Sequence, residues 1–396
     1  MSADSIRQLA SNLPEDADAR REIYKAAKEL MWRSEPPRET NFRIFWSNGA
    51  AAAGVAATDL GLFRILAKEP NRAFSAEELS KSTGADVTLL TRLLKVLAAW
   101  GYVGQPGPNA FQATNNTIAL TTPFAEGAAQ VQTQFSGPMF NALPEYLKKI
   151  GYKNPSDTSS TPFHMAYNTT KDIFEWFAEN KEWSDKVMGF MGVQREGQAP
   201  WMPRRELMQG FDVALSSEDL QKGRAQFVDV GGAVGHQSIA FREAYPELTG
   251  PVILQDLPFI VDLARKNPRT GEVKVTIQPH DFMTPETPEA KGAKIFYIRN
   301  VLHDWNDGKN SVILGHIRDA MAEDSILIID EAVVPDVDMA VQVAAYDMVM
   351  MAMPAAQERP EALWRDLVER QVGLKIRDIR KYDESSCDSL IFITKS

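Results

Sequence analysis

The sequence predicts an α/β fold in which a parallel, doubly wound sheet follows a helical N-terminal region with a winged helix. Two observations predict the sheet. From Arg224 onward, short apolar runs alternate with helical stretches, as is typical of such a sheet. The first run, residues 227–230, leads into the glycine-rich turn 231–235 and then into a helical stretch. Such a turn points backbone N–H groups and a helix N-terminus into one crevice, where a nucleotide-like ligand can bind.

The N-terminal region begins with charged sequence up to about Glu39 that has a helical pattern. Its apolar residues at helical spacing are Tyr24, Ala27, Leu30 and Met31. Residues 51–66 are small and apolar, and their alanines and Gly54 allow the close approach of another helix. We therefore expect a buried helix over 51–66, of a kind that can also lie between subunits.

A pair of helices is predicted after Phe74. Ser75 and Glu78 have the spacing of a capping box that opens a helix, and Asp86 can cap the next one. Gly101 ends the second helix. The apolar face of this second helix consists of Leu89, Leu90, Leu93, Leu94 and Leu97.

Two short strands, at 102–103 and 111–114, complete a helix-turn-helix with a wing. DNA binding would require basic residues on the second helix, which offers only Arg92 and Lys95. We therefore expect a structural or dimerising winged helix.

Residues 135–203 are aromatic-rich and irregular, and most of their rings should be ordinary helix core. Because this segment leads into the predicted sheet, its rings could equally wall a pocket for a flat ligand. Methionines adapt to such pockets. The candidates to line an apolar acceptor pocket are Phe135, Met139, His164, Trp176, Met188, Met191, Trp201, Tyr346, Met350 and Met353.

The strands of the sheet are predicted at residues 226–230, 252–256, 273–278, 294–299, 325–330 and 389–394. The chain then divides into three expected domains. Residues 1–130 form the winged-helix domain, residues 131–205 form an aromatic-rich helical linker that contributes to the pocket, and residues 206–396 form the ligand-binding sheet domain.

Composition narrows the function to a small-molecule ligand. The net charge of -10 and the pI near 5.2 argue against a general binder of nucleic acid or anionic membranes. Cys387 is the only cysteine, which excludes an intrachain disulfide and a cysteine metal cluster. The first residues lack a basic region followed by an apolar one, and no run approaches the roughly 18 apolar residues of a membrane span. We expect a cytoplasmic protein.

Polar residues at the ends of successive strands should converge, because ligands bind beyond the carboxyl ends of the strands in such sheets. The turn after the first strand contributes Asp229, Gly231, Gly232 and Gly235. Asp256 ends the second strand about 20 residues further on, where a carboxylate can accept hydrogen bonds from ribose hydroxyls. Asp281 and Phe282 follow the third strand, where a carboxylate and a ring could hydrogen-bond to and stack on an adenine.

His303 follows the fourth strand and should lie beside the same crevice. An imidazole there can take up a proton near neutral pH, and Glu331, at the end of the fifth strand, could orient it. A single histidine is more often structural. The strand-end position, the acidic neighbour and the adjacent ligand site together favour a functional residue.

The ordered motifs resemble one enzyme family. They are Asp229-Val-Gly-Gly-Ala-Val-Gly235, Asp256-Leu-Pro258, Asp281-Phe282, Leu302-His-Asp-Trp305 and Gln357-Glu-Arg359. In this order they resemble the S-adenosylmethionine-dependent O-methyltransferases of small phenolic molecules, of the caffeic acid and hydroxyindole type. The resemblance covers nearly the whole chain and is closest to the fungal natural-product branch, which includes methyltransferase-like pericyclases.

This resemblance implies a class I methyltransferase sheet, an N-terminal dimerising winged helix, a homodimer and the cofactor S-adenosylmethionine. Gly231 would lie against the methionine part of the cofactor and Asp256, with Leu257 beside it, would hold the ribose. Asp281 and Phe282 would face the adenine. Arg299 stands where many members have a lysine near the adenine, although the two cations are not interchangeable.

The resemblance also implies the catalytic residues. His303 would be the general base, and Glu331 and Glu358 would flank it and fix its orientation. The reaction would be an in-line displacement without a metal, in which an acceptor oxyanion attacks the sulfonium methyl group. The acceptor would be an aromatic or polyketide-like molecule. Ala233 departs from the family, since much of it has a glycine there, and this weakens the inference that the cofactor adopts the usual pose.

Three other functions would share some of these sequence features. A methyltransferase-like pericyclase or dehydratase would keep the cofactor without transferring methyl, and His164, Arg195 and Arg299 could be its hydrogen-bond donors. A nicotinamide-dependent dehydrogenase has no use for the His-Asp-Trp run together with Glu331. A ligand-sensing transcriptional regulator is opposed by the acidity of the chain and its weakly basic second helix.

Overall fold

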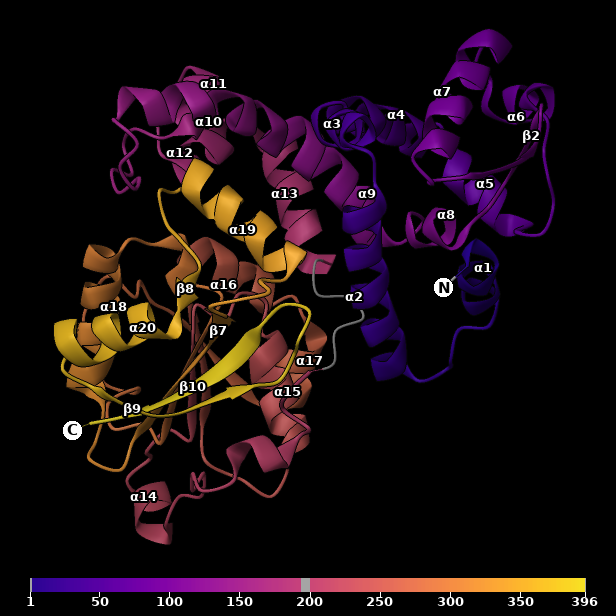
Figure 1. Cartoon of the computed structure of the whole chain (residues 1–396). Helices are drawn as coiled ribbons and strands as arrows, with labels where there is room; N and C mark the ends of the chain where they lie inside the picture. Colours follow the sequence, from indigo (N-terminus) through magenta and orange to yellow (C-terminus); the bar gives the residue numbers. More distant parts are fainter. Residues whose placement is uncertain (1, 194–199, 396) are drawn as a thin grey trace. The chain divides into compact units, whose positions relative to one another are not determined.

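The computed structural model describes residues 2–193 and 200–395. The chain divides into two compact units, residues 1–133 and residues 134–396. The first unit contains helices α1 (Ala3–Ser11), α2 (Ala17–Ser34), α3 (Pro37–Phe45), α4 (Ser47–Asp59), α5 (Leu62–Lys68), α6 (Ala76–Thr83), α7 (Val87–Ala99), α8 (Asn115–Ala119) and α9 (Pro123–Gln130), with strands β1 (Gly104–Gly107) and β2 (Ala110–Gln112) (Figure 1).

The predicted helix pair after Phe74 is α6 and α7. Glu78 donates its backbone N–H to Ser75 Oγ at 3.2 Å, and the Ser75 N–H donates to Glu78 Oε2 at 2.8 Å, so the capping box is confirmed. Asp86 caps α7 by accepting from the Leu89 N–H at 2.9 Å. Leu90, Leu94 and Leu97 are fully buried in the core of the unit, whereas Leu89 is exposed.

The wing of this winged helix is the antiparallel pair of β1 and β2. β1 begins just after the predicted strand 102–103, because the Val103 N–H still bonds back to Leu97 O at the end of α7. The second strand lies within one residue of its predicted start at 111.

The expectation of one helix over residues 51–66 is wrong. Gly61 has a φ of +65°, a conformation that glycine adopts without the usual steric penalty, and it separates α4 from α5. Gly54 does provide a close approach, but to a ring rather than a helix, since a Cβ there would lie 3.0 Å from Tyr102 Cε2. No single helix among the described residues is long and apolar enough to span a membrane, and α4 with α5 reaches that length only as a pair bent by 69°.

The second unit contains one eight-stranded mixed sheet. Its strands are β3 (Phe227–Val230), β4 (Val252–Asp256), β5 (Val275–Pro279), β6 (Ile295–Arg299), β7 (Ile326–Val334), β8 (Arg359–Pro360), β9 (Lys375–Lys381) and β10 (Asp388–Thr394). They follow the order β5-β4-β3-β6-β7-β10-β9, and β8 pairs with the end of β7. The order reverses direction between β3 and β6, which places the expected ligand crevice beyond their carboxyl ends.

All six predicted strands are present, but the sheet is not wholly parallel. β10 is antiparallel to β7 and to β9, because the short connection from Lys381 to Asp388 can only return the chain as a hairpin. β9 was not predicted. It lies at the edge of the sheet and carries five charged residues, Lys375, Arg377, Asp378, Arg380 and Lys381, a composition typical of protected edge strands.

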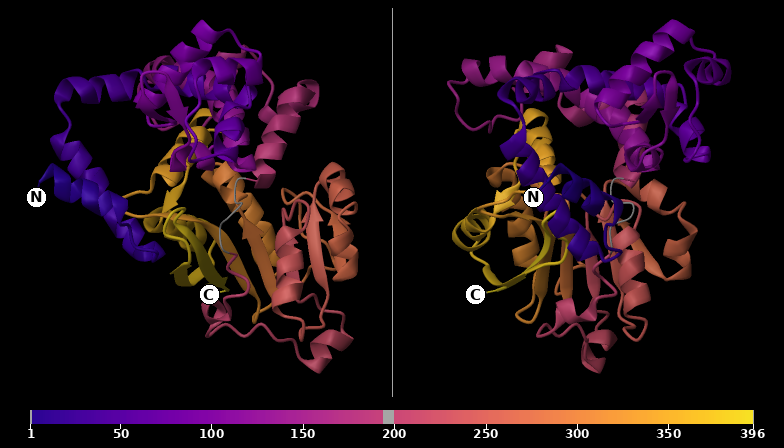
Figure 2. Two further views of the ribbon diagram at one scale, coloured as in Figure 1. Left: turned by 90° about the vertical axis from the view of Figure 1, so that its right-hand side faces the viewer. Right: turned by 45° about the vertical axis from the view of Figure 1, so that its right-hand side comes forward.

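Helices cover both faces of the sheet (Figures 1 and 2). The helices of this unit are α10 (Gly137–Lys149), α11 (Pro162–Tyr167), α12 (Ile173–Glu179), α13 (Lys181–Val193), α14 (Ser217–Gln221), α15 (His236–Ala244), α16 (Pro258–Ala264), α17 (Pro268–Glu272), α18 (Asp307–Ala320), α19 (Val341–Ala352) and α20 (Glu361–Arg365). Phe296 of β6 packs in one core cluster with Ile313 of α18, and the next residue, Tyr297, packs in the opposite cluster with Phe241 of α15. The strands are therefore buried on both faces, as expected of a doubly wound sheet.

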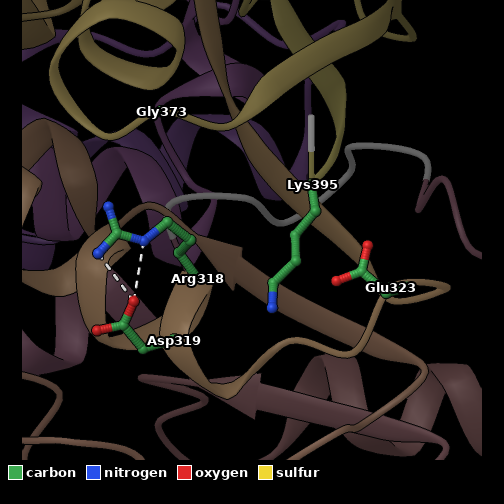
Figure 3. A pocket seen from close by; sticks show the side chains of 5 residues that line it. All are labelled: Arg318, Asp319, Glu323, Gly373 and Lys395. Carbon is green, nitrogen blue, oxygen red and sulfur yellow. Dashed lines mark hydrogen bonds and ion pairs between the residues drawn. The ribbon is translucent and has the colours of Figure 1, made fainter.

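A pocket of about 560 Å³ lies at the end of the sheet away from this crevice (Figure 3). Its lining residues are Arg318, Asp319, Glu323, Gly373 and Lys395. Lys395 follows β10, whose Ile393 pairs with Leu327 at the start of β7, so the pocket faces the amino ends of the parallel strands. Its charged lining and its position separate it from the candidate active site.

Candidate active site

The glycine turn between β3 and α15 forms the first wall of the crevice. The Gly231 and Gly232 N–H groups donate to the backbone carbonyl of Gln255 on β4, at 2.9 and 3.0 Å. Gly231 has a φ of +71°, and a Cβ there would lie 2.9 Å from Val301 Cγ2 and 3.7 Å from Phe282 Cε1. The absence of a side chain at Gly231 thus leaves room for Val301, and the ring of Phe282 lies beside the turn.

Asp229 supports this turn from inside. Its Oδ2 accepts from the Ser238 N–H at 3.1 Å and the Ser238 hydroxyl at 2.7 Å, which ties β3 to the first turn of α15. Burial raises the pKa of Asp229 to about 6, against the hydrogen bonds from Ser238. Gly232 and Gly235 have no room for a Cβ, which would lie 2.7 Å from Asp229 Cγ and 2.9 Å from Leu254 Cδ1 respectively.

Asp256 ends β4 beside the turn, as predicted. Its carboxylate accepts from the Ala233 N–H at 2.8 Å and from the Leu257 N–H at 2.7 Å. Burial raises the pKa of Asp256, and these two backbone bonds lower it. A carboxylate has about four acceptor positions, so it retains capacity for ligand hydroxyls. Ala233 lies at φ +49°, so the chain tolerates here the backbone conformation that the glycine of other members would supply.

The loop after β5 carries Asp281 and Phe282. Asp281 is exposed, and its Oδ1 accepts from the Met283 N–H at 2.9 Å within its own turn. Phe282 packs against the core cluster and meets Trp305 edge to face, with ring centroids 6.2 Å apart. The turn, the Asp256 carboxylate and the Phe282 ring therefore fit a nucleoside-containing cofactor.

Arg299 ends β6 within a buried polar cluster. Its Nε lies 3.3 Å from Asp330 Oδ2 on β7, and its Nη2 is 3.5 Å from the Tyr382 hydroxyl. The Asp330 carboxylate also accepts from the Tyr297 hydroxyl at 2.5 Å and from Trp201 Nε1 at 3.0 Å. The guanidinium is thus neutralised by Asp330, and Trp201 is part of this cluster.

His303 lies in a short turn, residues 302–304, directly after β6. Its Nδ1 is 2.8 Å from Glu358 Oε1 and 3.9 Å from Glu331 Oε2, and its Nε2 is 3.6 Å from Asp304 Oδ1. The side chains of Glu331 and Glu358 are 0% and 3% exposed, and that of His303 is 17% exposed. The structure therefore brings the three predicted catalytic residues together.

Glu331 holds both the imidazole and the backbone that carries it. Its Oε1 accepts from the Val301 and Leu302 N–H groups, each at 2.9 Å, and its Oε2 faces His303 without a hydrogen bond among the described residues. Burial raises the pKa of Glu331 to about 7, although the charge of His303 lowers it. Burial lowers the pKa of His303, but the charges of Asp304, Glu331 and Glu358 outweigh it and raise this pKa to about 10.

Comparison with known proteins identifies the family. A model of the O-methyltransferase domain matches residues 161–373, more than half of the chain. The chain belongs to this O-methyltransferase family. The resemblance inferred from the ordered motifs is confirmed.

Curated fungal members of the family are similar along most of the chain. Methyltransferase cfoC of Aspergillus candidus is 32% identical over 387 residues, covering 96% of this chain and 92% of the relative. Demethylsterigmatocystin 6-O-methyltransferase of Aspergillus parasiticus is 32% identical over 340 residues, covering 85% of this chain and 83% of the relative.

Solved structures share the fold. The structure of LepI in complex with SAM has a TM-score of 0.84 and 29% identity, covering 99% of this chain and 97% of that chain. A structure described as a pericyclic reaction enzyme matches with the same TM-score and identity, covering 99% and 98%. The predicted fold class, an α/β methyltransferase sheet after a helical region, is thus confirmed.

The predicted acceptor-pocket residues of this O-methyltransferase family member occupy different environments. Phe135 is buried among the rings of Tyr167, Trp176, Phe177 and Trp183, with centroids 5.5 to 5.9 Å apart. Met139, Trp176 and Met350 are also buried, whereas Tyr346 and Met353 are half-buried. Met188 and Met191 are 47% and 50% exposed on α13, so the structure does not bring them into the aromatic cluster.

His164 differs from these residues in carrying a buried ring nitrogen, Nε2, that makes no hydrogen bond within the described parts of the chain. Its Nδ1 is 3.2 Å from the Thr161 N–H, which can only donate, and 2.8 Å from the Thr161 hydroxyl. The donor of the neutral ring is then Nε2, which is buried and lacks a hydrogen bond among the described residues. Burial lowers the pKa of His164, which favours this neutral form. Arg195, the other donor considered from the sequence, lies outside the described residues.

Arg359 and Asn310 hold the His303 loop, and neither was singled out from the sequence. The fully buried Arg359 guanidinium donates to Leu302 O at 3.0 Å and to Trp305 O at 2.9 Å, and pairs with Asp307 Oδ1 at 2.8 Å. Asn310 Nδ2 donates to the same two carbonyls, at 2.8 and 2.9 Å. Leu302 O and Trp305 O are backbone carbonyls, so side-chain patterns in the sequence carry no signal for the contacts that hold them.

Asp347 of α19 positions the second glutamate. Its Oδ1 accepts from the Glu358 N–H at 2.9 Å, and burial raises the pKa of Asp347. The ligand-type atoms of His303, Glu331 and Glu358 lie within 4.8 Å of one another, which is the one such group found in the described parts of the chain. These three residues could therefore also hold a divalent cation.

Proposed function

We propose that this protein is an S-adenosylmethionine-dependent O-methyltransferase of a small aromatic or polyketide-like molecule, with His303 as its general base. The observation that carries the proposal is the contact between His303 Nδ1 and Glu358 Oε1 at 2.8 Å, with Glu331 behind the same nitrogen. This arrangement fixes the ring through Nδ1, so that Nε2, which lies 3.6 Å from Asp304 Oδ1, is the nitrogen that receives a proton.

The cofactor is S-adenosylmethionine, as in the LepI complex and in the family. Asp256 would accept hydrogen bonds from the ribose, the glycine turn would lie against the methionine part, and Phe282 would face the adenine. When bound, this cofactor supplies a methyl group that its sulfonium makes electrophilic. The chain itself must orient the acceptor and remove its proton.

His303 is suited to a phenolic acceptor. A phenol has a pKa near 10, and the surrounding carboxylates raise the pKa of His303 to about 10. Proton transfer between groups of similar pKa is close to thermoneutral, whereas an ordinary imidazole would be a much weaker acceptor. The negative charges around the ring then stabilise the imidazolium that the transfer forms.

The acceptor class is supported by two further observations. Demethylsterigmatocystin 6-O-methyltransferase, whose name gives a small-molecule acceptor methylated on oxygen, is 32% identical to this chain. The aromatic cluster around Phe135 and Trp176 lies in the same unit as the catalytic residues, and such rings suit a flat apolar molecule better than a sugar or a peptide.

We also propose a homodimer with no nucleic-acid or membrane partner. Large apolar side chains are exposed on α2, on α3 and directly after α3, with Trp32 at 57%, Phe45 at 71% and Trp46 at 58%. Exposed apolar surface of this size is typical of an interaction site. The acidic net charge of -10 opposes nucleic acid and anionic lipid.

Replacement of His303 by Ala tests the base. We expect turnover with a methyl-acceptor panel to fall by about 10² to 10⁴-fold, while the affinity for S-adenosylhomocysteine, measured by calorimetry, stays within a factor of about two. The expected product is the acceptor plus one methyl group by mass spectrometry. An undiminished rate in the His303→Ala variant would remove His303 from the mechanism.

A pericyclase or dehydratase is the second candidate function. The buried Nε2 of His164 makes no hydrogen bond among the residues that the structure describes, so it is a donor that could hold a carbonyl of a reactive substrate. A structure described as a pericyclic reaction enzyme is 29% identical. Methyl transfer ranks first because a cyclase has no evident need for the complete arrangement of His303, Glu331 and Glu358. Methyl-labelled cofactor distinguishes the two, since a pericyclase leaves the label on the cofactor while product forms.

A further inference from the structure

A buried polar cluster lies beneath the loop 280–287, away from His303. The side chains of His280 and Glu286 are 5% and 1% exposed, and His280 Nε2 lies 3.6 Å from Glu286 Oε2. Ionisable side chains are rarely buried to this degree unless they are paired. The methyl-transfer mechanism above gives this pair no role.

Gln255 connects the pair to the glycine turn. Its side-chain Nε2 donates to Glu286 Oε2 at 3.1 Å, and its backbone carbonyl accepts from the Gly231 and Gly232 N–H groups at 2.9 and 3.0 Å. A displacement of Glu286 therefore acts, through one residue, on the backbone that forms the first wall of the crevice.

His280 connects the pair to the loop that carries Asp281 and Phe282. Its N–H donates to the Asp256 backbone carbonyl at 2.9 Å, and it directly precedes Asp281 and Phe282 in the chain. The imidazole and Glu286 thus bracket the loop that presents these two residues.

The hydrogen bonds in the cluster depend on the charge of Glu286. Gln255 Nε2 faces three acceptors, Gln278 Oε1 and Glu286 Oε2 at 3.1 Å and Thr287 Oγ1 at 3.3 Å, but has only two hydrogens. Gln255 Oε1 and His280 Nε2 have no partner among the described residues. Protonation of Glu286 would turn an acceptor into a donor and so favour a different orientation of the Gln255 amide.

We propose that Glu286 is a positioning residue for the cofactor: with His280 and Gln255 it holds the Asp281–Phe282 loop against the glycine turn, so that cofactor affinity depends on whether Glu286 is ionised. The proposal rests on the cofactor site of the proposed function. It does not depend on whether methyl is transferred.

The charged groups around Glu286 set the direction of the effect. Burial raises its pKa, whereas the charges of His280 and of His316 on α18, with the Gln255 hydrogen bond, lower it. The His316 ring is itself held at Met283 O, 3.2 Å from its Nε2. The ionised carboxylate is the form that accepts from Gln255, so affinity should fall as pH falls and Glu286 is protonated.

Calorimetric titration with S-adenosylhomocysteine between about pH 5.5 and 8.5 tests the inference. The wild type should bind more weakly at the acid end. Glu286→Gln should bind about tenfold more weakly than the wild type at the alkaline end, the loss of about one charge-assisted hydrogen bond, and its affinity should be nearly independent of pH.

Glu289→Gln is the matched control. Glu289 is exposed and accepts from Gln278 Nε2 at 3.1 Å, next to the cluster but without contact to His280. It should keep the wild-type affinity and pH dependence. His280→Gln removes a charge that lowers the pKa of Glu286. The loss of affinity should therefore move to higher pH in this variant, which provides a second test if Glu286→Gln does not fold.

The outcomes separate this inference from the proposed function. If Glu286→Gln and His280→Gln bind as the wild type does at every pH, the positioning role is wrong. If the wild type does not bind S-adenosylhomocysteine at any pH, the cofactor site itself is wrong.

Discussion

Glu358 Oε1 lies 2.8 Å from His303 Nδ1, across a separation of 55 residues in the chain. A carboxylate at this distance accepts a hydrogen bond from Nδ1–H. It thereby keeps the proton on Nδ1 and leaves Nε2 as the nitrogen that can act as a base. The geometry of this pair is the physical basis of the first prediction.

The rate of methyl transfer should rise with pH, because only the neutral imidazole accepts a proton and the pKa of His303 is raised to about 10. Glu358→Gln removes one of the charges that raise it. The rising limb of kcat/KM against pH should therefore move to lower pH, and the limiting rate should fall by about 10²-fold as orientation is lost. A limb that stays in place would show that another group titrates.

Arg359→Lys should destabilise the protein and the catalytic loop. An ammonium cannot reach Leu302 O, Trp305 O and Asp307 together as the guanidinium does. Leaving buried carbonyls unpaired should lower the free energy of unfolding by about 3 kcal/mol in urea titrations, with a parallel fall in kcat. Arg365→Lys is the control, since Arg365 is 43% exposed and its ion pairs in the described structure are with Glu361 and Glu369, four residues before and after it. Equal effects of the two changes would contradict the role of Arg359 in holding the His303 loop.

Ala233→Gly should stabilise the fold. Ala233 has a φ of +49°, a conformation that costs a residue with a Cβ about 1 kcal/mol or more. Glycine removes this strain, but it also increases the entropy of the unfolded chain, which offsets part of the gain in stability. We expect a small rise in the urea midpoint with the Asp256 contact kept, because the donor is the backbone N–H. Ala240→Gly, the same change within α15, should lower stability by about 1 kcal/mol. Destabilisation by both would show that the turn is unstrained.

Asp256→Asn should weaken cofactor binding without unfolding the protein. The amide keeps one acceptor for the Ala233 or Leu257 N–H but loses the charge offered to ribose hydroxyls. The dissociation constant for S-adenosylhomocysteine should rise by about 10 to 100-fold. Asp262→Asn, which alters an exposed ion pair with Arg265 on α16, should leave it unchanged. Unaltered binding in Asp256→Asn would place the ribose elsewhere.

Local features of this chain were predictable because neighbouring residues encode them. The capping box of Ser75 and Glu78, the cap at Asp86 and the glycine turn each depend on a few consecutive positions, and the structure contains all three. The convergence of Asp256, His303 and Glu331 followed from the rule that parallel strands end at one edge.

Contacts that depend on tertiary packing were not predictable. Trp201 and Tyr382 donate to Asp330 from positions 129 and 52 residues away, and no spacing rule connects such residues. The exposure of Met188 and Met191 on α13 likewise depends on which face of that helix packs against the rest of the unit. The missed strand β9 shows the same limit, because its charges suit an edge that only the assembled sheet defines.

Asp330 and Glu331 are consecutive on β7, and they serve opposite layers of the sheet. Asp330 accepts from Tyr297 and Trp201 on one side, and Glu331 accepts from Val301 and Leu302 on the other. Sliding β7 by a single residue against β10, where Ser389 faces Glu331, would exchange the two carboxylates and leave both sets of donors mismatched. These two neighbouring carboxylates thereby favour one register of the central strands, since only one alignment satisfies the donors on both sides at once.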